Sequence, residues 1–304
     1  MDDGPEIAIA GCRAAASADP EDLYPDPDSE LLVAALRARG RRAAMVSWDD
    51  PAVTWEAIGV VAVRSTWDSV DRPAEYLRWA RHVGEVSTLV NPADVLAWNL
   101  DKVYLADLAG LGVPVVPTRF LRPGTSWALP PGEFVVKPAI SAGGRDTARY
   151  GPPHAADAQS HIRRLLDRGQ TVMVQPYLPA VEDPGEMSVV FIDGRFSHAV
   201  RKGPVLQAGA GVVERPWERM TYLGAATPSS AERDVAQWAA ATVERRFGPL
   251  VYSRVDLIRD RTGEPLVIEV ELIDPYLSLS LSPGAPATLA SALDRCLVRT
   301  RSAN

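Results

Sequence analysis

Alternating apolar and polar residues in the last third of the chain predict two antiparallel β-hairpins. The first spans residues 186–202 and turns at Asp193-Gly194, a dipeptide typical of tight hairpin turns. The second joins strands at 251–258 and 266–273 through a polar turn at Thr262-Gly263. Because successive side chains of a strand point to opposite faces, each hairpin should carry its polar residues together on one face.

The first 90 residues follow a different pattern, in which short apolar strands alternate with amphipathic helices. Strands are predicted at residues 6–10, 43–46, 60–64 and 88–90, and helices at 30–39 and 73–82. Asp28-Ser29 is expected to cap the first helix. This alternation is typical of a parallel sheet with crossover helices, and Asn91-Pro92 marks its end.

The middle of the chain combines two lysines with a glycine-containing loop. Lys102 lies on a helix predicted at 101–109, and Lys137 ends an apolar strand, where an ammonium is unusual unless it meets an anion. The loop at 141–147 is rich in small residues that would let backbone N–H groups approach a phosphate. Taken alone, such a loop is more often only a turn. A strand at 171–174 then leads into a proline break.

Three acidic residues of the second hairpin form the clearest candidate site. With the turn at Thr262-Gly263, Asp256 should lie opposite Glu269, with Glu271 next along the same face. Three adjacent carboxylates repel one another unless a cation neutralises them, and Mg²⁺ prefers such oxygen ligands. A solvated outer face is the alternative, and the hairpin alone does not separate the two interpretations.

Two further clusters carry polar chemistry. Arg64, Ser65 and Trp67 follow a strand of the N-terminal sheet, where they offer a guanidinium, a hydroxyl and an indole wall to a ligand. A polar loop in which Trp67 packs locally is the alternative. Counted outward from its turn, the first hairpin pairs Glu186 with Arg201, as a site pair or an ordinary cross-strand salt bridge.

Composition narrows the class of protein. The chain has 304 residues, 46% of them apolar and 23% charged, enough for two or three lobes. A net charge of −7 argues against a general nucleic-acid surface. Two distant cysteines, Cys12 and Cys296, argue for a reducing compartment. Because the sequence shows neither a signal-peptide pattern nor an apolar run long enough to span a membrane, we expect a cytoplasmic protein.

Taken in order, these features resemble those of a known enzyme family. Two lysines, a glycine loop, a proline break and two polar hairpins are similar to the ATP-grasp ligases of the glutathione synthetase and RimK-like group, most closely the small actinobacterial enzymes that form cycloserine. The resemblance covers nearly the whole chain. It implies an α/β ATP-grasp fold with an N-terminal α/β lobe (1–90), a middle lobe (91–178) and a C-terminal lobe (179–304), with ATP between two antiparallel sheets.

The resemblance also implies where ATP binds. Lys102 and Lys137 would hold its phosphates, and the loop 141–147 would close over the β- and γ-phosphates. The loop residues concerned are Ser141, Gly143 and Gly144. The adenine pocket would be lined by Gln175, Tyr177 and Leu178, and the ribose would be bound by an acid, Glu182 or Glu186. The glycine-bearing segment 203–227 is expected to act as a lid.

Catalysis and metal binding are implied for the two hairpins. Arg201 would stabilise the transferred phosphoryl group, with Lys202 as a second catalytic candidate, and Asp256, Glu269 and Glu271 would bind Mg²⁺. These ligases commonly have Glu-x-Asn where this chain has Glu269-Val270-Glu271. Residues 274–276 also depart from the usual small residues and are expected to shape the substrate pocket. The substrate residues would be Arg64, Ser65, Trp67 and Tyr276.

The implied reaction joins a small amino-acid-like carboxylate to an amine, through an acyl phosphate, with release of ADP and phosphate. Such a ligase would serve specialised metabolism such as antibiotic biosynthesis, with ATP and Mg²⁺ as cofactors. Ring closure within one molecule is an alternative, as are a small-molecule phosphotransferase and a non-catalytic nucleotide-binding protein. We expect no nucleic-acid or membrane partner, and homodimers are usual in the group.

Overall fold

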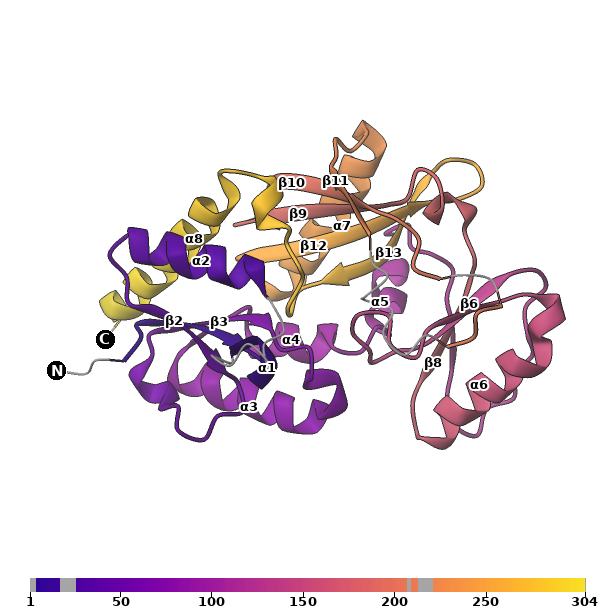
Figure 1. The fold of residues 1–304 in the computed structure, drawn as a ribbon, viewed down its shortest axis with the longest axis horizontal. Helices are drawn as coiled ribbons and strands as arrows, with labels where there is room; N and C mark the ends of the chain where they lie inside the picture. Colours follow the sequence, from indigo (N-terminus) through magenta and orange to yellow (C-terminus); the bar gives the residue numbers. More distant parts are fainter. Residues whose placement is uncertain (1–3, 17–25, 207–208, 213–220, 304) are drawn as a thin grey trace.

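The computed structural model describes residues 4–16, 26–206, 209–212 and 221–303, which form three lobes, each built on its own sheet (Figure 1). The N-terminal sheet is parallel, with the strand order β2-β1-β3-β4. The sheet orders β5-β8-β6-β7 and β11-β10-β9-β12-β13 are both antiparallel. This combination of one parallel and two antiparallel sheets confirms the predicted fold class.

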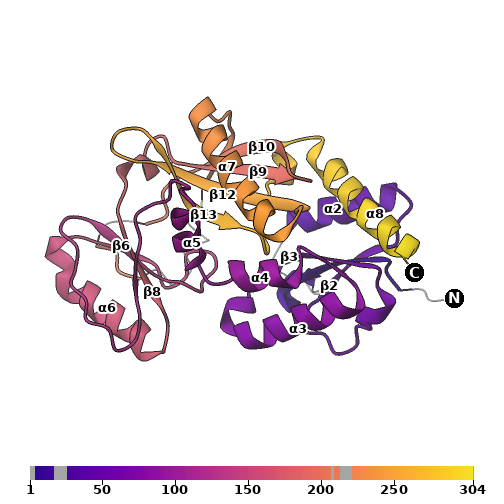
Figure 2. The same cartoon turned by 180° about the vertical axis from the view of Figure 1, so that it is seen from behind.

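The N-terminal lobe is a parallel sheet covered by helices on both faces. Its strands are β1 (Ile7–Gly11), β2 (Ala43–Ser47), β3 (Val60–Ser65) and β4 (Thr88–Val90), and its helices are α1 (Arg13–Ala16), α2 (Pro27–Ala38) and α3 (Pro73–Val86). The last helix of the chain, α8 (Ala285–Ala303), packs beside α2 on one face, while α3 covers the other (Figures 1 and 2). The two ends of the chain therefore meet on this lobe.

The start of α2 differs from the prediction. The helix begins at Pro27, and its cap is Asp26, whose side chain accepts a hydrogen bond from the Ser29 N–H at 3.1 Å. The predicted cap at Asp28-Ser29 is therefore wrong. Asp28 is instead buried and accepts hydrogen bonds from the backbone of Leu277 at 2.6 Å and Leu279 at 2.7 Å. It links the N-terminal lobe to a loop that follows the last strand of the C-terminal sheet.

The middle lobe is a four-stranded sheet with one long helix on its outer side. It contains β5 (Arg119–Leu121), β6 (Phe134–Pro138), β7 (Ala148–Tyr150), α6 (Ala155–Asp167) and β8 (Val172–Pro176). The helix predicted at 101–109 is present as α5 (Tyr104–Gly110) but begins three residues later, and a separate helix, α4 (Ala93–Asn99), precedes it. The break between these helices contains Lys102, whose backbone N–H bonds to the carbonyl of Ala139 at 2.9 Å.

The C-terminal lobe is a five-stranded sheet with one face on α7 and the other on the cleft. It contains β9 (Glu186–Ile192), β10 (Arg195–Lys202), β11 (Tyr222–Ala225), α7 (Ser230–Phe247), β12 (Tyr252–Arg259) and β13 (Pro265–Glu271). Of the predicted lid at 203–227, residues 207–208 and 213–220 lie outside the described residues. Within the described chain, no helix combines the length and apolarity needed to cross a bilayer.

A β-bulge changes the register of the first predicted hairpin. Phe196 pairs with Phe191 as expected, but the register shifts between Phe196 and His198. Beyond the shift, Lys202 pairs with Glu186, and Arg201 pairs with Met187. The predicted pairing of Glu186 with Arg201 is therefore wrong, because the extra residue of a bulge moves every later side chain to the opposite face.

We predict that His161 makes the middle lobe sensitive to acid. The imidazole is buried, with Nδ1 3.0 Å from the Tyr150 hydroxyl, and burial followed by repulsion from Arg164 lowers its pKa from 6.5 to about 4. The folded state therefore favours the neutral ring. The resulting stability is complete above pH 6.5 and is lost as the pH falls toward 4, by roughly 3 kcal/mol at most.

Urea unfolding of the wild type and of His161→Gln between pH 7 and pH 4 tests this prediction. The variant should be less stable than the wild type at pH 7, and the gap should narrow as the pH falls. A difference in the free energy of unfolding that stays constant over this range would contradict it.

Candidate active site

A cleft of about 720 Å³ lies between the lobes and gathers most of the predicted site residues. The N-terminal lobe contributes Trp67. The middle lobe (91–178) contributes Lys102, Lys137, Ser141, Gly143, Gly144, Gln175, Tyr177 and Leu178. The C-terminal lobe contributes Glu186, Lys202, Asp256, Glu269, Glu271 and Tyr276. Four predicted residues, Arg64, Ser65, Glu182 and Arg201, are not part of its lining.

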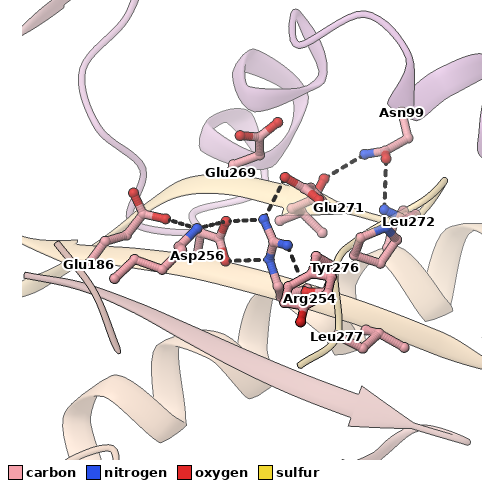
Figure 3. Close-up of polar contacts among 12 residues, drawn as sticks. Asn99, Glu186, Arg254, Asp256, Glu269, Glu271, Leu272, Tyr276 and Leu277 are labelled. Atoms are coloured by element: carbon pink, nitrogen blue, oxygen red, sulfur yellow. Dashed lines mark hydrogen bonds and ion pairs between the residues drawn. The ribbon is translucent and has the colours of Figure 1, made fainter. Parts of the chain in front are cut away.

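Three carboxylates converge on the cleft-facing side of the C-terminal sheet (Figure 3). The pairing of β12 with β13 places Asp256 opposite Glu269 as predicted, after a register shift between Asp256 and Leu257, and Glu271 is the next residue on that face. One oxygen atom from each of the three lies within 4.8 Å of the others. Convergent carboxylate oxygens are the donor set that suits Mg²⁺, so these residues fit that ion.

Arg254, on the same strand as Asp256, and Lys202, at the end of β10, balance the charge of these acids. Arg254 makes two hydrogen bonds to Asp256, at 2.8 and 2.7 Å, and one to Glu271 at 2.6 Å. Lys202 Nζ lies 2.9 Å from Asp256 Oδ2 and also pairs with Glu186. Burial alone would raise the pKa of Asp256, but Arg254 and Lys202 outweigh it and hold that pKa well below its usual value.

Lys102 and Lys137 bring positive charge from the middle lobe. Lys102 Nζ lies 3.1 Å from Glu269 Oε1 and donates a hydrogen bond to the carbonyl of Ser141 at 2.7 Å. Burial lowers the pKa of Lys137, although Glu269 opposes the shift. Glu269 itself has a lowered pKa, because Lys102 and Lys137 outweigh the effect of burial.

Glu271 titrates differently from the two acids beside it. Burial raises its pKa to about 7, since Arg254 offsets only part of the cost and the charges on Glu269 and Asp256 oppose ionisation. A bound cation would remove that repulsion. The cations around the cluster therefore compensate the negative charge of Glu271 only in part.

The far wall of the cleft is a polar and aromatic edge of the middle lobe. Gln175 Nε2 donates to the Thr118 hydroxyl at 2.8 Å, and the Tyr177 hydroxyl donates to Glu182 at 2.8 Å. Glu182 is held outside the lining by Arg149, which also stacks over the Tyr177 ring at 3.4 Å. Of the two acids expected at a ribose, only Glu186 reaches the cleft.

Arg201 points away from the cleft as a result of the bulge. Its guanidinium donates to the carbonyl of Gly185 at 3.2 Å and lies 3.9 Å from Glu232, which belongs to α7 on the opposite face of the sheet. Lys202 occupies the cleft-facing position and is only 7% exposed. The structure thus places a lysine ammonium where the register count had placed a guanidinium.

Arg64 and Ser65 lie behind the cleft rather than on it. Arg64 is 2% exposed, donates to the Pro275 carbonyl at 2.6 Å and lies 3.9 Å from Asp28. The guanidinium therefore does not line the cleft to which the sequence assigned it. Arg64 instead helps to hold the segment that carries Tyr276, which does line the cleft with Trp67.

The sequence reasoning missed one residue of the site, Asn99. Asn99 on α4 bonds to the backbone on either side of Glu271, donating to the Val270 carbonyl at 2.7 Å and accepting from the Leu272 N–H at 2.8 Å (Figure 3). Nothing in the sequence singles it out. Asp274 lines the cleft and accepts a hydrogen bond from Thr66 at 3.1 Å. Asp274 belongs to the segment 274–276, which the sequence predicted to shape the substrate pocket.

Comparisons with known proteins agree with this geometry. Residues 7–91 match the family described as D-cycloserine synthetase DcsG, N-terminal domain. The chain is 38% identical over 281 residues to the cycloserine biosynthesis protein DcsG of Streptomyces lavendulae, covering 88% of this chain and 93% of that protein. The crystal structure of D-cycloserine synthetase DcsG superposes with a TM-score of 0.84 at 35% identity, covering 96% of this chain and 99% of that one.

More distant structures share the fold. A D-alanine–D-alanine ligase from Bacillus anthracis superposes with a TM-score of 0.65 at 13% identity, over 99% of each chain. A RimK domain protein of the ATP-grasp type from Sphaerobacter thermophilus superposes with a TM-score of 0.61 at 17% identity, over 95% of this chain and 99% of that one. These two show the architecture alone.

The neighbours Lys202 and Arg201 give a direct test of the bulged register. Lys202→Met should lower the free energy of unfolding by roughly 3 kcal/mol, because it leaves the buried Glu186 without its cation and removes one of the two cations beside Asp256. Arg201→Met, on the other face, should cost about 1 kcal/mol or less. Urea unfolding of both variants measures the difference, and equal losses would contradict the assigned faces.

Proposed function

The chain belongs to the ATP-grasp ligase family, among relatives of D-cycloserine synthetase DcsG, and is therefore an ATP-dependent, amide-forming ligase; on this premise we propose that its substrate is a small amino-acid-like carboxylate. The observation that carries the proposal is the cleft, in which Asp256, Glu269 and Glu271 face lysines of another lobe. Enzymes that transfer a phosphoryl group use carboxylates to bind the metal ion and lysines to bind the phosphates, and this cleft contains both kinds of residue.

The nucleotide would lie between the middle and C-terminal sheets. Lys102 and Lys137 are proposed to bind its phosphates, with backbone N–H groups of Ser141, Gly143 and Gly144 beside them. Gln175, Tyr177 and Leu178 would form the adenine wall, and Glu186 would meet the ribose. In support, a D-alanine–D-alanine ligase of this fold is described in complex with ATP, and the ATP-grasp ligase PsnB with Mg and ADP.

Asp256, Glu269 and Glu271 are the residues that would hold Mg²⁺. When bound, the ion supplies positive charge against the phosphate oxygens of the nucleotide. Arg254 and Lys102 help to lower the pKa values of Asp256 and Glu269, so these two acids are ionised before any cation binds. The raised pKa of Glu271, about 7, reflects the charge still to be compensated.

The proposed reaction has two steps. The substrate carboxylate attacks the γ-phosphorus, and the bond between the γ-phosphorus and the bridging oxygen breaks. ADP is released, and the substrate becomes an acyl phosphate. An amine then attacks the acyl carbon, the carbon–oxygen bond to phosphate breaks, and the nitrogen gives up a proton. Lys202, a buried cation facing the cleft, is proposed to stabilise charge on the transferred phosphoryl group.

We further propose that amine and carboxylate belong to one molecule, so that the amide closes a cycloserine-type ring. The similarity to D-cycloserine synthetase extends over nearly the whole chain and includes the N-terminal lobe, which contributes Trp67 to the cleft. Ligation of two separate molecules would use the same phosphoryl chemistry. The choice between ring closure and ligation therefore depends on the residues that would bind the substrate, not on those that would bind the nucleotide.

An assay of ADP release tests the carboxylate activation. With Mg-ATP and a panel of amino acids and amino-acid derivatives, an active compound should release ADP and, in the presence of hydroxylamine, give a hydroxamate, because hydroxylamine captures an acyl phosphate. A compound that needs no second amine for turnover supports ring closure. ADP release that never yields a hydroxamate would favour a phosphotransferase instead.

Glu269→Gln should reduce ADP release by at least about a hundredfold, because it removes a charge from the proposed metal site without changing side-chain volume. The melting temperature should change little, since the amide can still contact Lys102. Glu264→Gln, on the exposed turn of the same hairpin, is the matched control and should keep full activity. Unchanged turnover in Glu269→Gln would remove this residue from the metal site.

A further inference from the structure

The acidic side chains that line the cleft are paired with cations, with one exception among the described residues. Among the described residues, each of the following acids lies within 4.0 Å of a lysine or arginine: Asp68 with Arg72, Glu186 with Lys202, Asp256 with Lys202 and Arg254, Glu269 with Lys102, and Glu271 with Arg254. Asp274 lines the same cleft and has no such partner within the described chain. It is the carboxylate that remains available to a cationic ligand.

The Asp274 carboxylate is held in place by a buried hydroxyl. Thr66 is fully buried at the end of β3, donates to Asp274 Oδ2 at 3.1 Å, and has its Oγ1 3.3 Å from the hydroxyl of Tyr76. A neutral hydroxyl fixes the direction of a carboxylate without cancelling its charge. Asp274 is therefore positioned but not neutralised.

The backbone around Asp274 is fixed from three directions. Arg64 donates to the carbonyl of Pro275 at 2.6 Å, and Arg254 donates to that of Tyr276 at 2.9 Å. Asp28 accepts the N–H groups of Leu277 and Leu279. These bonds come from different elements, so the segment cannot swing toward a distant cation. A binding group held this rigidly is typical of a site formed before its ligand arrives.

The surroundings of Asp274 favour a ligand with a positive charge and an apolar body. Burial raises the pKa of Asp274 to about 6, and the hydrogen bond from Thr66 and the more distant charges of Arg64 and Lys102 offset only part of this rise. Trp67 and Tyr276 line the same cleft, and the Tyr276 ring lies 5.1 Å from that of Tyr222. Aromatic faces attract cations, and a carboxylate attracts an ammonium more strongly when water is displaced.

We propose that Asp274 binds the protonated amino group of the substrate, and that it thereby selects an amino acid over a carboxylic acid lacking that group. This inference rests on the proposed function, because it assigns the amino group of the same small substrate. Asp274 becomes a specificity-determining residue, and Thr66 the positioning residue that orients it. Arg64 and Asp28 act one step further back, on the backbone that carries Asp274.

The test compares two ligands that differ only in an amino group. D-cycloserine and its deamino counterpart, 1,2-oxazolidin-3-one, are titrated into the full-length protein with Mg-ADP present, and heat of binding is measured near neutral pH. The wild type should bind D-cycloserine at least about tenfold more tightly. In Asp274→Asn, which keeps the size and the hydrogen bond to Thr66, the ratio of the two dissociation constants should fall to about one.

Matched variants separate charge recognition from a general structural effect. Asp68→Asn, a cleft acid already paired with Arg72, should leave the ratio between the two ligands as in the wild type. Thr66→Val should reduce the ratio, and Thr66→Ser, which keeps the hydroxyl, should restore it. A ratio that falls equally in Asp68→Asn and Asp274→Asn would overturn the assignment.

The remaining outcomes distinguish this inference from the proposed function. Wild-type protein that binds both ligands equally overturns the role of Asp274 and leaves carboxylate activation untouched, since the hydroxamate assay measures that separately. Wild-type protein that binds neither ligand overturns the inference and also argues against a cycloserine-type product. An unchanged preference for D-cycloserine in Asp274→Asn moves amino-group recognition to another residue.

Discussion

Crowding of buried carboxylates is the constraint around which this molecule is arranged. Glu186, Asp256, Glu269 and Glu271 lie together in a low-dielectric cleft, where each raises the cost of ionising the next. Lys202 and Arg254 come from strands of the same sheet, and Lys102 comes from the break between α4 and α5. The lobes therefore have to meet in one arrangement, because no lobe contains both the acids and all their partners.

Buried hydrogen bonds hold the lobes in that arrangement. Tyr252 of the C-terminal sheet places its hydroxyl within 3.0 Å of the carbonyl oxygens of Val63, Val90 and Ile273, the first two from the N-terminal lobe. Asn91 donates to the carbonyls of Tyr252 and Leu272 at 3.0 and 2.8 Å. Buried polar groups are costly without partners, so these contacts disfavour any sliding of one sheet over the other.

Sequence reasoning was accurate where local pattern determines geometry and inaccurate where distant contacts do. The pattern around Thr262-Gly263 correctly predicted Asp256 opposite Glu269, although the observed strands reach this pairing through a register shift between Asp256 and Leu257 that the sequence did not predict. The Asp193-Gly194 turn fixed the register only as far as Phe196, since no residue pattern announced the bulge that follows. Arg64 was predicted at a cleft because strand ends collect ligands, but its burial depends on Pro275, 211 residues further along the chain.

The replacement of the usual Glu-x-Asn by Glu269-Val270-Glu271 becomes understandable from the same charge balance. An additional carboxylate beside Asp256 and Glu269 would be unfavourable by itself, yet Glu271 accepts a hydrogen bond from Arg254 at 2.6 Å. That guanidinium also contacts Asp256 and the backbone of Tyr276. Through Arg254, Glu271 is therefore linked to the segment that carries Asp274. The Arg254 guanidinium contacts both the proposed metal site and the segment proposed to bind the substrate. An asparagine at this position could accept the same hydrogen bond from Arg254 but carries no charge. Asp256 would then be the only carboxylate that contacts Arg254 and offsets its positive charge.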